Sequence, residues 1–138
     1  MKSTKNFLSV LLSLFIIISS FVITQAVAVA DEYKTDYNVT LSANGKNATI
    51  LTGPKNDANC NYSTISLTGG TVDHINAWIV NTNGTMISKY KYKVPKNTND
   101  KKLYYNDGQS VSKNTITSIR IEQNNVQSKT AIGNANIK

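Results

Sequence analysis

Apolar and polar side chains alternate along most of the chain from residue 33 onward. In residues 33–41, for example, Tyr33, Tyr37, Val39 and Leu41 fall on odd-numbered positions, and polar residues occupy the even ones. A period of two places alternate side chains on one face of a β-strand. No long window shows the spacing of three to four residues that is typical of an amphipathic helix. The pattern therefore predicts strands.

Turn-forming residues divide the rest of the chain into short segments. Clusters of Gly, Asn, Asp and Pro separate runs rich in β-branched and aromatic residues. The predicted strands are residues 33–41, 47–51, 60–68, 75–80, 85–94, 103–106, 115–122 and 126–132. The polar runs at residues 53–59 and 95–102 are predicted loops, and Gly69-Gly70 is a predicted turn. About seven to eight short strands predict an all-β fold, either an antiparallel β-sandwich or a small barrel.

The N-terminal segment has a different composition. Lys2 and Lys5 precede an uncharged, mostly apolar run at residues 7–24, and an Ala-x-Ala pattern ends at Ala30. This order is typical of a secretory signal peptide, with its apolar helix and its small-residue cleavage site. An uncleaved membrane anchor is the alternative, because the run is about long enough to span a bilayer. We expect residues 1–30 to be a signal helix and residues 31–138 to form a single secreted β domain.

The residue types also indicate a source and a redox setting. The chain is rich in Asn, Lys, Ile and Thr and contains a single Arg. Together with the signal sequence, this composition favours a Gram-positive bacterium. Cys60 is the only cysteine, so no disulfide can form within the chain. It is interpreted as a half-buried strand residue, with a reactive thiol as the alternative.

Positive charge is concentrated in one segment. Residues 89–102 contain six lysines and one acid, whereas the rest of residues 31–138 contains seven basic and seven acidic residues. A concentrated patch of one sign attracts polyanions through its summed field. Lysines on an exposed edge strand also prevent edge-to-edge aggregation. The composition is compatible with either role.

The segment "INAWIVNTNGTMISKYKYKV", residues 75–94, holds the only tryptophan, Trp78, and an Asn83-Gly84 pair. That pair favours a type I′ hairpin with a two-residue loop. Such a loop places Trp78 opposite Lys89 and puts both on one face with the neighbouring lysines, while the tyrosines lie on the core face. A three-residue loop with a bulge would break this assignment.

Three interpretations of this face are open. Trp78 is covered by another sheet, with lysine stems around it; or it is an exposed aromatic on a basic surface, able to stack on a sugar ring or to enter a membrane interface; or the face is an aggregation-limiting edge without a partner. The candidate binding surface is Trp78, Lys89, Lys91, Lys93, Lys96, Lys101 and Lys102.

Catalytic and metal-binding patterns are missing from the sequence. There is no Gly-x-Ser-x-Gly motif, and one histidine and one cysteine are too few for a zinc site. Asp57, Asn59 and Asn61 alternate like calcium ligands, but the glycine and the closing glutamate of a calcium loop are absent. We expect no catalytic residues, no metal and no cofactor. Nucleic acid is not an expected partner either, because its recognition relies on arginine and the patch is all lysine.

Two stretches carry a resemblance to known proteins. Together with the signal sequence, "INAWIVNTNGT" and "LYYNDGQSVSKNTITSIRIEQNN" resemble small secreted Firmicutes proteins of a family of unknown function, often encoded near bacteriocin-type export genes. A weaker likeness is to lactococcin 972-type bacteriocins, which are similar in size, in aromatic and lysine content and in export route. That likeness implies binding to a cell-wall precursor.

These observations predict a secreted, non-enzymatic protein that is extracellular or loosely associated with the cell wall. The expected partner is a cell-wall polyanion or an anionic membrane surface, bound through the Trp/Lys face. One alternative is a bacteriocin-like toxin that acts on the cell envelope. Another is a secreted assembly subunit that pairs exposed strands.

Overall fold

The computed structural model describes residues 33–107 and 111–138. The predicted signal peptide, residues 1–30, lies outside these residues. Within the two described ranges, no helix is long and apolar enough to cross a membrane. All the regular structure of this part of the chain is β-strand, as the alternation of side chains predicts.

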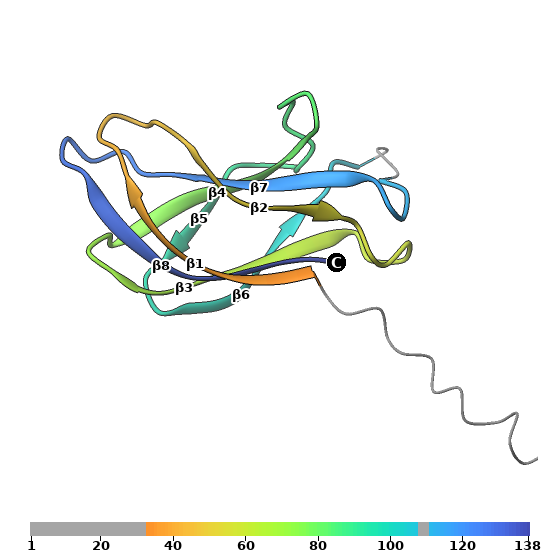
Figure 1. The fold of residues 1–138 in the computed structure, drawn as a ribbon, viewed down its shortest axis with the longest axis horizontal. Helices are drawn as coiled ribbons and strands as arrows, with labels where there is room; N and C mark the ends of the chain where they lie inside the picture. Colours follow the sequence, from red (N-terminus) through yellow and green to blue (C-terminus); the bar gives the residue numbers. More distant parts are fainter. Residues whose placement is uncertain (1–32, 108–110) are drawn as a thin grey trace, which may run out of the picture. The chain divides into compact units, whose positions relative to one another are not determined.

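Eight strands form two antiparallel sheets of four strands each. Sheet A has the order β1-β8-β3-β6, and sheet B has the order β2-β7-β4-β5. Figure 1 shows the two sheets as two layers. The strands are β1 (Tyr33–Leu41), β2 (Ala48–Pro54), β3 (Tyr62–Gly70), β4 (His74–Asn81), β5 (Tyr92–Pro95), β6 (Thr98–Tyr104), β7 (Ile116–Glu122) and β8 (Lys129–Ile137). The prediction of an all-β fold with about eight strands is confirmed.

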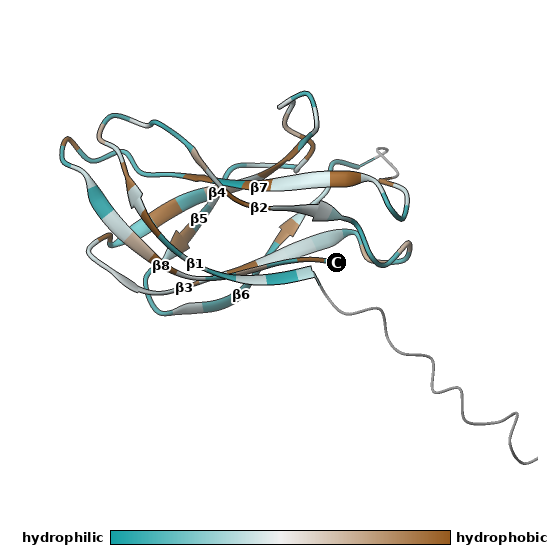
Figure 2. Cartoon of the chain, viewed as in Figure 1, coloured by the Kyte–Doolittle hydropathy of each residue, from teal (hydrophilic) through white to brown (hydrophobic). Residues whose placement is uncertain are grey.

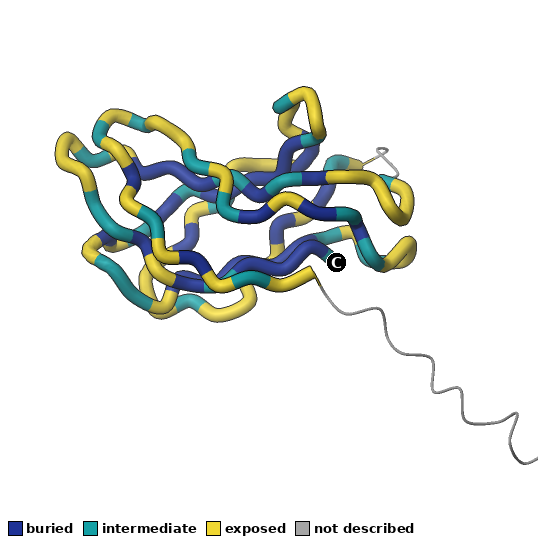
Figure 3. The backbone as a smooth tube through the Cα atoms, viewed as in Figure 1, coloured by how far each residue is buried: buried dark blue, intermediate teal, exposed yellow. Residues whose placement is uncertain are grey.

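One hydrophobic core lies between the layers. Both sheets contribute to it, with Ile65 and Leu67 from β3 in sheet A and Ile79, Ile119 and Ile121 from sheet B. Apolar positions follow the strands of both layers in Figure 2, and the same stretches are buried in Figure 3, while exposed positions gather in the connecting loops. Each fully buried isoleucine contributes roughly 1.5–3 kcal/mol relative to an exposed one. The apolar side chains of the alternating pattern therefore form the inner face of each sheet.

The hairpin after β4 has a three-residue loop, so the predicted two-residue loop is wrong. The Asn81 N–H donates to the Thr85 carbonyl at 2.9 Å, and the Gly84 N–H donates to the Asn81 carbonyl at 3.0 Å. Gly84 has a φ of 79°, the left-handed conformation that closes a loop of this type with a bulge. Val80 consequently pairs with Met86, and Ile87, the predicted partner, turns into the core. The predicted faces return in β5, where Val94 lies in the core and Lys93 pairs with Asn76 on the outer face.

After this loop the chain leaves β4 and joins the edge of sheet A. The Ile87 N–H donates to the Ile79 carbonyl of sheet B at 2.9 Å, but Ser88 pairs with Tyr105, which directly follows β6. The chain returns to β4 only at β5, where Val94 pairs with Ile75. The predicted strand at residues 85–94 is therefore two separate pieces. Between them, residues 87–89 connect the two sheets along one edge.

Two further predicted boundaries are wrong. Gly69 and Gly70, a predicted turn, form the end of β3, where the register against β8 shifts and Gly70 adopts a φ of 99°. The predicted loop at residues 95–102 contains most of β6, whose residues are largely exposed. An edge strand of this kind needs only one neighbour and few apolar residues. The alternation of hydrophobic side chains, on which the prediction rested, is therefore weak in β6.

Candidate functional site

Trp78 is buried on the outer face of sheet B. Its neighbours in β4, Ala77 and Ile79, belong to the central core, so the indole ring points away from that core. Nevertheless only 5% of the Trp78 surface is exposed. The next outer-face residue, Val80, is also buried outside the core cluster. A second, smaller apolar group therefore lies on the outside of this sheet.

Charged side chains lie over and beside the indole. The Lys91 ammonium lies 4.2 Å from the centre of the Trp78 ring and 2.9 Å from Glu122 Oε1, so one cation contacts both groups. Arg120 pairs with Trp78 across β7 and β4, and its guanidinium lies beside Gly84 at the tip of the hairpin loop. Figure 1 shows this loop standing above the sheet B layer, on the side away from sheet A. The cation over the ring thus comes from the segment between the hairpin and β5, and not from a further sheet.

Most of the other lysines of the predicted surface are separated from one another. Lys89 forms an ion pair with Asp107, and the hydrogen bond to that carboxylate raises the pKa of Lys89. The Lys96 ammonium donates to the Gly70 carbonyl at 2.7 Å. Lys93 pairs with Asn76 across β5 and β4, so it is exposed on the outer face of sheet B, the predicted face that it shares with Trp78 and Lys91. Lys89 and Lys96 lie at an edge and in a loop, so the predicted surface is only partly brought together.

The remaining two lysines lie on β6, in the other sheet. Lys101 pairs with Ile65, a core residue, and so emerges at the open edge beside the core. Lys102 pairs with Thr64 and stands on the outer face of sheet A. Of the seven residues predicted to form one surface, Lys102 is the one that the fold places within a different cluster of cations and aromatic rings.

A row of four residues crosses the outer face of sheet A. Lys34 on β1 pairs with Asn136 on β8, Asn136 pairs with Thr64 on β3, and Thr64 pairs with Lys102 on β6. The two lysines are exposed, whereas Thr64 and Asn136 are 6% and 5% exposed. Neighbouring strands lie about 4.8 Å apart, so the Cα atoms of the two lysines are separated by roughly 14 Å. Short polar side chains thus form a floor between two cations.

Aromatic rings border the same row. Tyr62 and Tyr104 pair across β3 and β6, with ring centroids 5.7 Å apart in an edge-to-face arrangement. The Lys102 ammonium lies 4.3 Å from the centre of the Tyr62 ring. A depression of about 250 Å³ over Thr64 and Asn136 is surrounded by Tyr62, Lys102, Lys34, Lys138 and Asp100, and Tyr104 lies beside it against Tyr62. We call this surface the lysine–tyrosine face: Lys34, Tyr62, Thr64, Lys102, Tyr104, Asn136 and Lys138.

The sequence contains only a partial signal for this face. Lys34 occupies an even-numbered position of the first strand, opposite in direction to Tyr33 and Tyr37, and so its outward direction follows from the alternation. Lys34 and Lys138 lie at opposite ends of the described chain, and no local pattern connects them with Lys102. The register of β8 between β1 and β3 brings them together.

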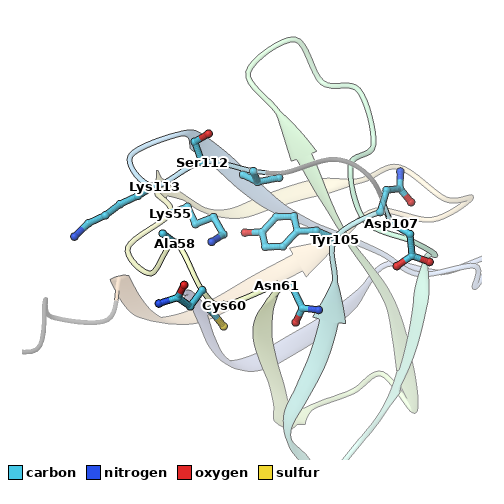
Figure 4. Close-up of a pocket in the computed structure, with 11 residues that line it drawn as sticks. Lys55, Ala58, Cys60, Asn61, Tyr105, Asp107, Ser112 and Lys113 are labelled. Atoms are coloured by element: carbon cyan, nitrogen blue, oxygen red, sulfur yellow. The ribbon is translucent and has the colours of Figure 1, made fainter.

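A second cavity lies at one end of the sheets. It has a volume of about 610 Å³ and is lined by the loop after β2, by the residues that follow β6 and by those that precede β7. Lys55, which is 2% exposed, and Tyr105 form part of its wall (Figure 4). The Tyr105 hydroxyl lies 3.1 Å from Ser63 Oγ, and burial raises the pKa of this phenol. We call this cavity the end pocket.

Asp57, Asn59 and Asn61, which alternate like calcium ligands in the sequence, lie in the loop beside this pocket. Asp57 Oδ1 accepts a hydrogen bond from the Asn59 N–H at 2.8 Å, so its carboxylate stabilises its own loop. Among residues 33–107 and 111–138, no group of three or more His, Cys, Asp or Glu side chains could hold a metal ion.

Comparison with protein-family models, with curated proteins and with solved structures found no match to this chain.

Proposed function

We propose that this protein binds an anionic polymer of the bacterial cell surface through the lysine–tyrosine face. The observation that carries this proposal is the row from Lys34 through Asn136 and Thr64 to Lys102. It spans the whole width of sheet A, so it suits an extended chain that lies across the strands. Three lysines and a single carboxylate, Asp100, surround the depression. The surplus of positive charge favours a polyanion.

Each component of the face suits a different part of such a polymer. The exposed ammonium groups of Lys34 and Lys102 pair with phosphate or carboxylate groups. The floor offers the hydroxyl of Thr64 and the amide of Asn136 to sugar hydroxyls. The rings of Tyr62 and Tyr104 provide apolar and cation–π contacts at one side. A repeating anionic sugar or polyol polymer combines all three chemistries.

The covered position of Trp78 is the reason for placing the binding surface on sheet A. An indole that is 5% exposed and lies under Lys91 cannot stack on a sugar ring without movement of the hairpin. Secretion and location at the cell surface rest on the signal sequence at residues 1–30. We also take the domain to be an antiparallel β-sandwich and not a closed barrel, because its eight strands divide into two sheets around one core.

Retention of the purified protein on isolated Gram-positive cell walls tests the proposal. A Lys34→Gln/Lys102→Gln variant should lose up to about thirtyfold in affinity, since each of the two exposed charge contacts contributes up to about 1 kcal/mol. Binding of the wild type should weaken when the salt concentration rises from about 0.01 M to about 1 M, because the Debye length falls from about 30 Å to about 3 Å. Vesicles of anionic and of neutral lipid, run in parallel, distinguish a wall polymer from a membrane surface.

The matched control is a Lys93→Gln/Lys96→Gln variant, which removes the same charge from β5 and the loop after it. It should be retained like the wild type. If the two double variants are retained equally, binding depends on net charge alone and the proposed face is wrong. An unchanged Trp78 emission spectrum in both variants shows that the fold is intact.

A further inference from the structure

The end pocket is distinct from the lysine–tyrosine face and shares no lining residue with it. Its volume of about 610 Å³ lies within the range of small-molecule sites, roughly 300–1,000 Å³. The wall consists mainly of polar side chains, among them Asn59, Asn61 and Ser112. Such groups can donate hydrogen bonds to an oxygen-rich ligand. The pocket therefore has the size and the lining of a binding site for a small polar molecule.

Lys55 gives the pocket its charge. The side chain is 2% exposed, yet it forms no ion pair with any carboxylate of the described residues. Asp57 is close to Lys55 in the sequence, and Asp107 lines the same pocket, but both carboxylates have other partners. Asp57 Oδ1 accepts the Asn59 N–H, and Asp107 is paired with Lys89. Among the described residues, the Lys55 ammonium donates one hydrogen bond, to the backbone carbonyl of Asp57.

A buried ammonium without a counter-ion can donate further hydrogen bonds to a ligand. It carries three N–H donors, and a charge without a counter-ion in a low-dielectric setting costs several kcal/mol. The Tyr105 ring, whose centre lies 5.9 Å away, offers weak compensation. Figure 4 shows the amine end of Lys55 and the hydroxyl end of Tyr105 pointing toward each other, whereas Lys113 extends away from both. An anion beside Lys55 would satisfy the remaining donors.

We propose that the end pocket binds a small molecule through a carboxylate or phosphate group, with Lys55 as the counter-ion. Asn61 and Ser112, which line the same cavity, contact the rest of the ligand. This site takes a single anionic group beside a buried lysine, unlike the row across sheet A, which suits a polymer. Its occupancy does not depend on the cell-wall interaction proposed above.

Cys60 provides a built-in reporter, because it lines the pocket and is the only cysteine of the chain. The experiment measures the rate at which neutral iodoacetamide alkylates Cys60 in the purified protein, in the presence of sodium acetate, inorganic phosphate or acetamide at constant ionic strength. Acetate or phosphate should slow alkylation in a saturable manner, about tenfold at ten times its Kd, since only the free fraction reacts. Acetamide, the neutral counterpart of acetate, should not protect Cys60.

Two variants locate the effect. Lys55→Met keeps the unbranched, apolar stem of the side chain but removes the charged amine, and should abolish protection. Lys113→Met removes a charge that points away from the site, and should leave protection unchanged. The proposal is overturned if neither anion slows alkylation of the wild type, or if acetamide protects as well as acetate. Because these two outcomes use the wild type alone, the test does not depend on the folding of Lys55→Met, which Trp78 emission checks separately.

Discussion

At the scale of single residues, Trp78 shows how a side chain can be buried outside the core. The indole stands on the outer face of sheet B, with the Lys91 ammonium over its ring and Arg120 as its neighbour on β7. Lys91 both covers the ring and neutralises Glu122, whose side chain is 11% exposed. The cation over the ring is Lys91, whereas the predicted two-residue loop placed Lys89 opposite Trp78. This contact leaves little of the ring for a ligand.

Replacing Lys91 by Ala should uncover Trp78. We expect the free energy of unfolding to fall by about 1 kcal/mol, because the change removes both a cation–π contact and the partner of a mostly buried carboxylate. The emission of the single tryptophan should shift to longer wavelength and be quenched more readily by acrylamide. Lys93→Ala, on the exposed part of β5, is the control and should leave the spectrum as it is. An unchanged spectrum in Lys91→Ala would show that the lysine does not cover the ring.

The free energy of unfolding should fall at alkaline pH, because three tyrosines have raised pKa values in the folded protein. Burial raises the pKa of Tyr37, Tyr92 and Tyr105 above the ordinary phenol value. In the unfolded chain these groups lose their protons near pH 10, while the folded protein still holds them. Their contribution is therefore complete below about pH 10 and is lost as the pH rises further. Tyrosinate absorbance during a pH titration should show a late-ionising group of residues, and urea denaturation should show falling stability over the same interval.

The Tyr37 hydroxyl also connects the core to the backbone of β3. It donates to the Ser66 carbonyl at 2.7 Å. Tyr37→Phe keeps the packing of the ring but leaves that carbonyl without this donor, so we expect a loss of about 1–2 kcal/mol in the free energy of unfolding. Chemical denaturation of both proteins measures it. Equal midpoints would show that the hydroxyl contributes nothing to stability.

At the scale of elements, the sequence predicted the existence of the strands better than their pairing. The range of β1 agrees with the predicted strand, because every second residue of Tyr33–Leu41 follows the alternation. The hairpin after β4 does not, because a loop of two residues and one of three residues are both compatible with Asn83-Gly84. The Asn81 carboxamide accepts hydrogen bonds from the Asn83 and Thr85 N–H groups at 3.0 and 2.9 Å and so stabilises the longer loop.

The two glycines at the end of β3 offer a matched test of strand geometry. Gly70 has a φ of 99°, and a Cβ there would overlap the Thr130 carbonyl of β8. Gly70→Ala should therefore lower the free energy of unfolding by about 2–4 kcal/mol, from backbone strain and overpacking combined. A Cβ at Gly69 would lie 3.5 Å from Ile132, an ordinary contact, so Gly69→Ala should change stability little. Thermal denaturation compares the two, and similar melting temperatures would contradict the assigned register of β3 and β8.

At the scale of the whole molecule, the first and last strands depend on each other. β8 lies between β1 and β3 in sheet A, although β1 and β8 are the outermost strands in the described sequence. The same arrangement builds the lysine–tyrosine face, since Lys34 and Asn136 belong to these two strands. Fold and proposed function thus rest on one long-range pairing.

Deleting residues 129–138 should prevent folding. The deletion removes the partner of β1 and three core residues, Ala131, Ala135 and Ile137. We expect the circular dichroism spectrum of an unfolded chain and no cooperative thermal transition. Deleting Lys138 alone is the control and should leave the transition intact, because Lys138 lies beyond the end of β8. A cooperative transition in the longer deletion would mean that sheet A forms without its second strand.

The sequence by itself determined that this protein is built of strands, where most of them lie and which side chains form the inner faces. These properties depend on the two-residue period and on local turn residues, which a single chain displays directly. Only the tertiary structure decided that Trp78 is covered, that the predicted lysines are divided between two sheets and that Lys34, Thr64, Lys102 and Asn136 form one row. The physical reason is that strand register and order follow from contacts between residues far apart in the chain. The loop after β4 illustrates this, because its third residue changes the partner of Val80 from the predicted Ile87 to Met86.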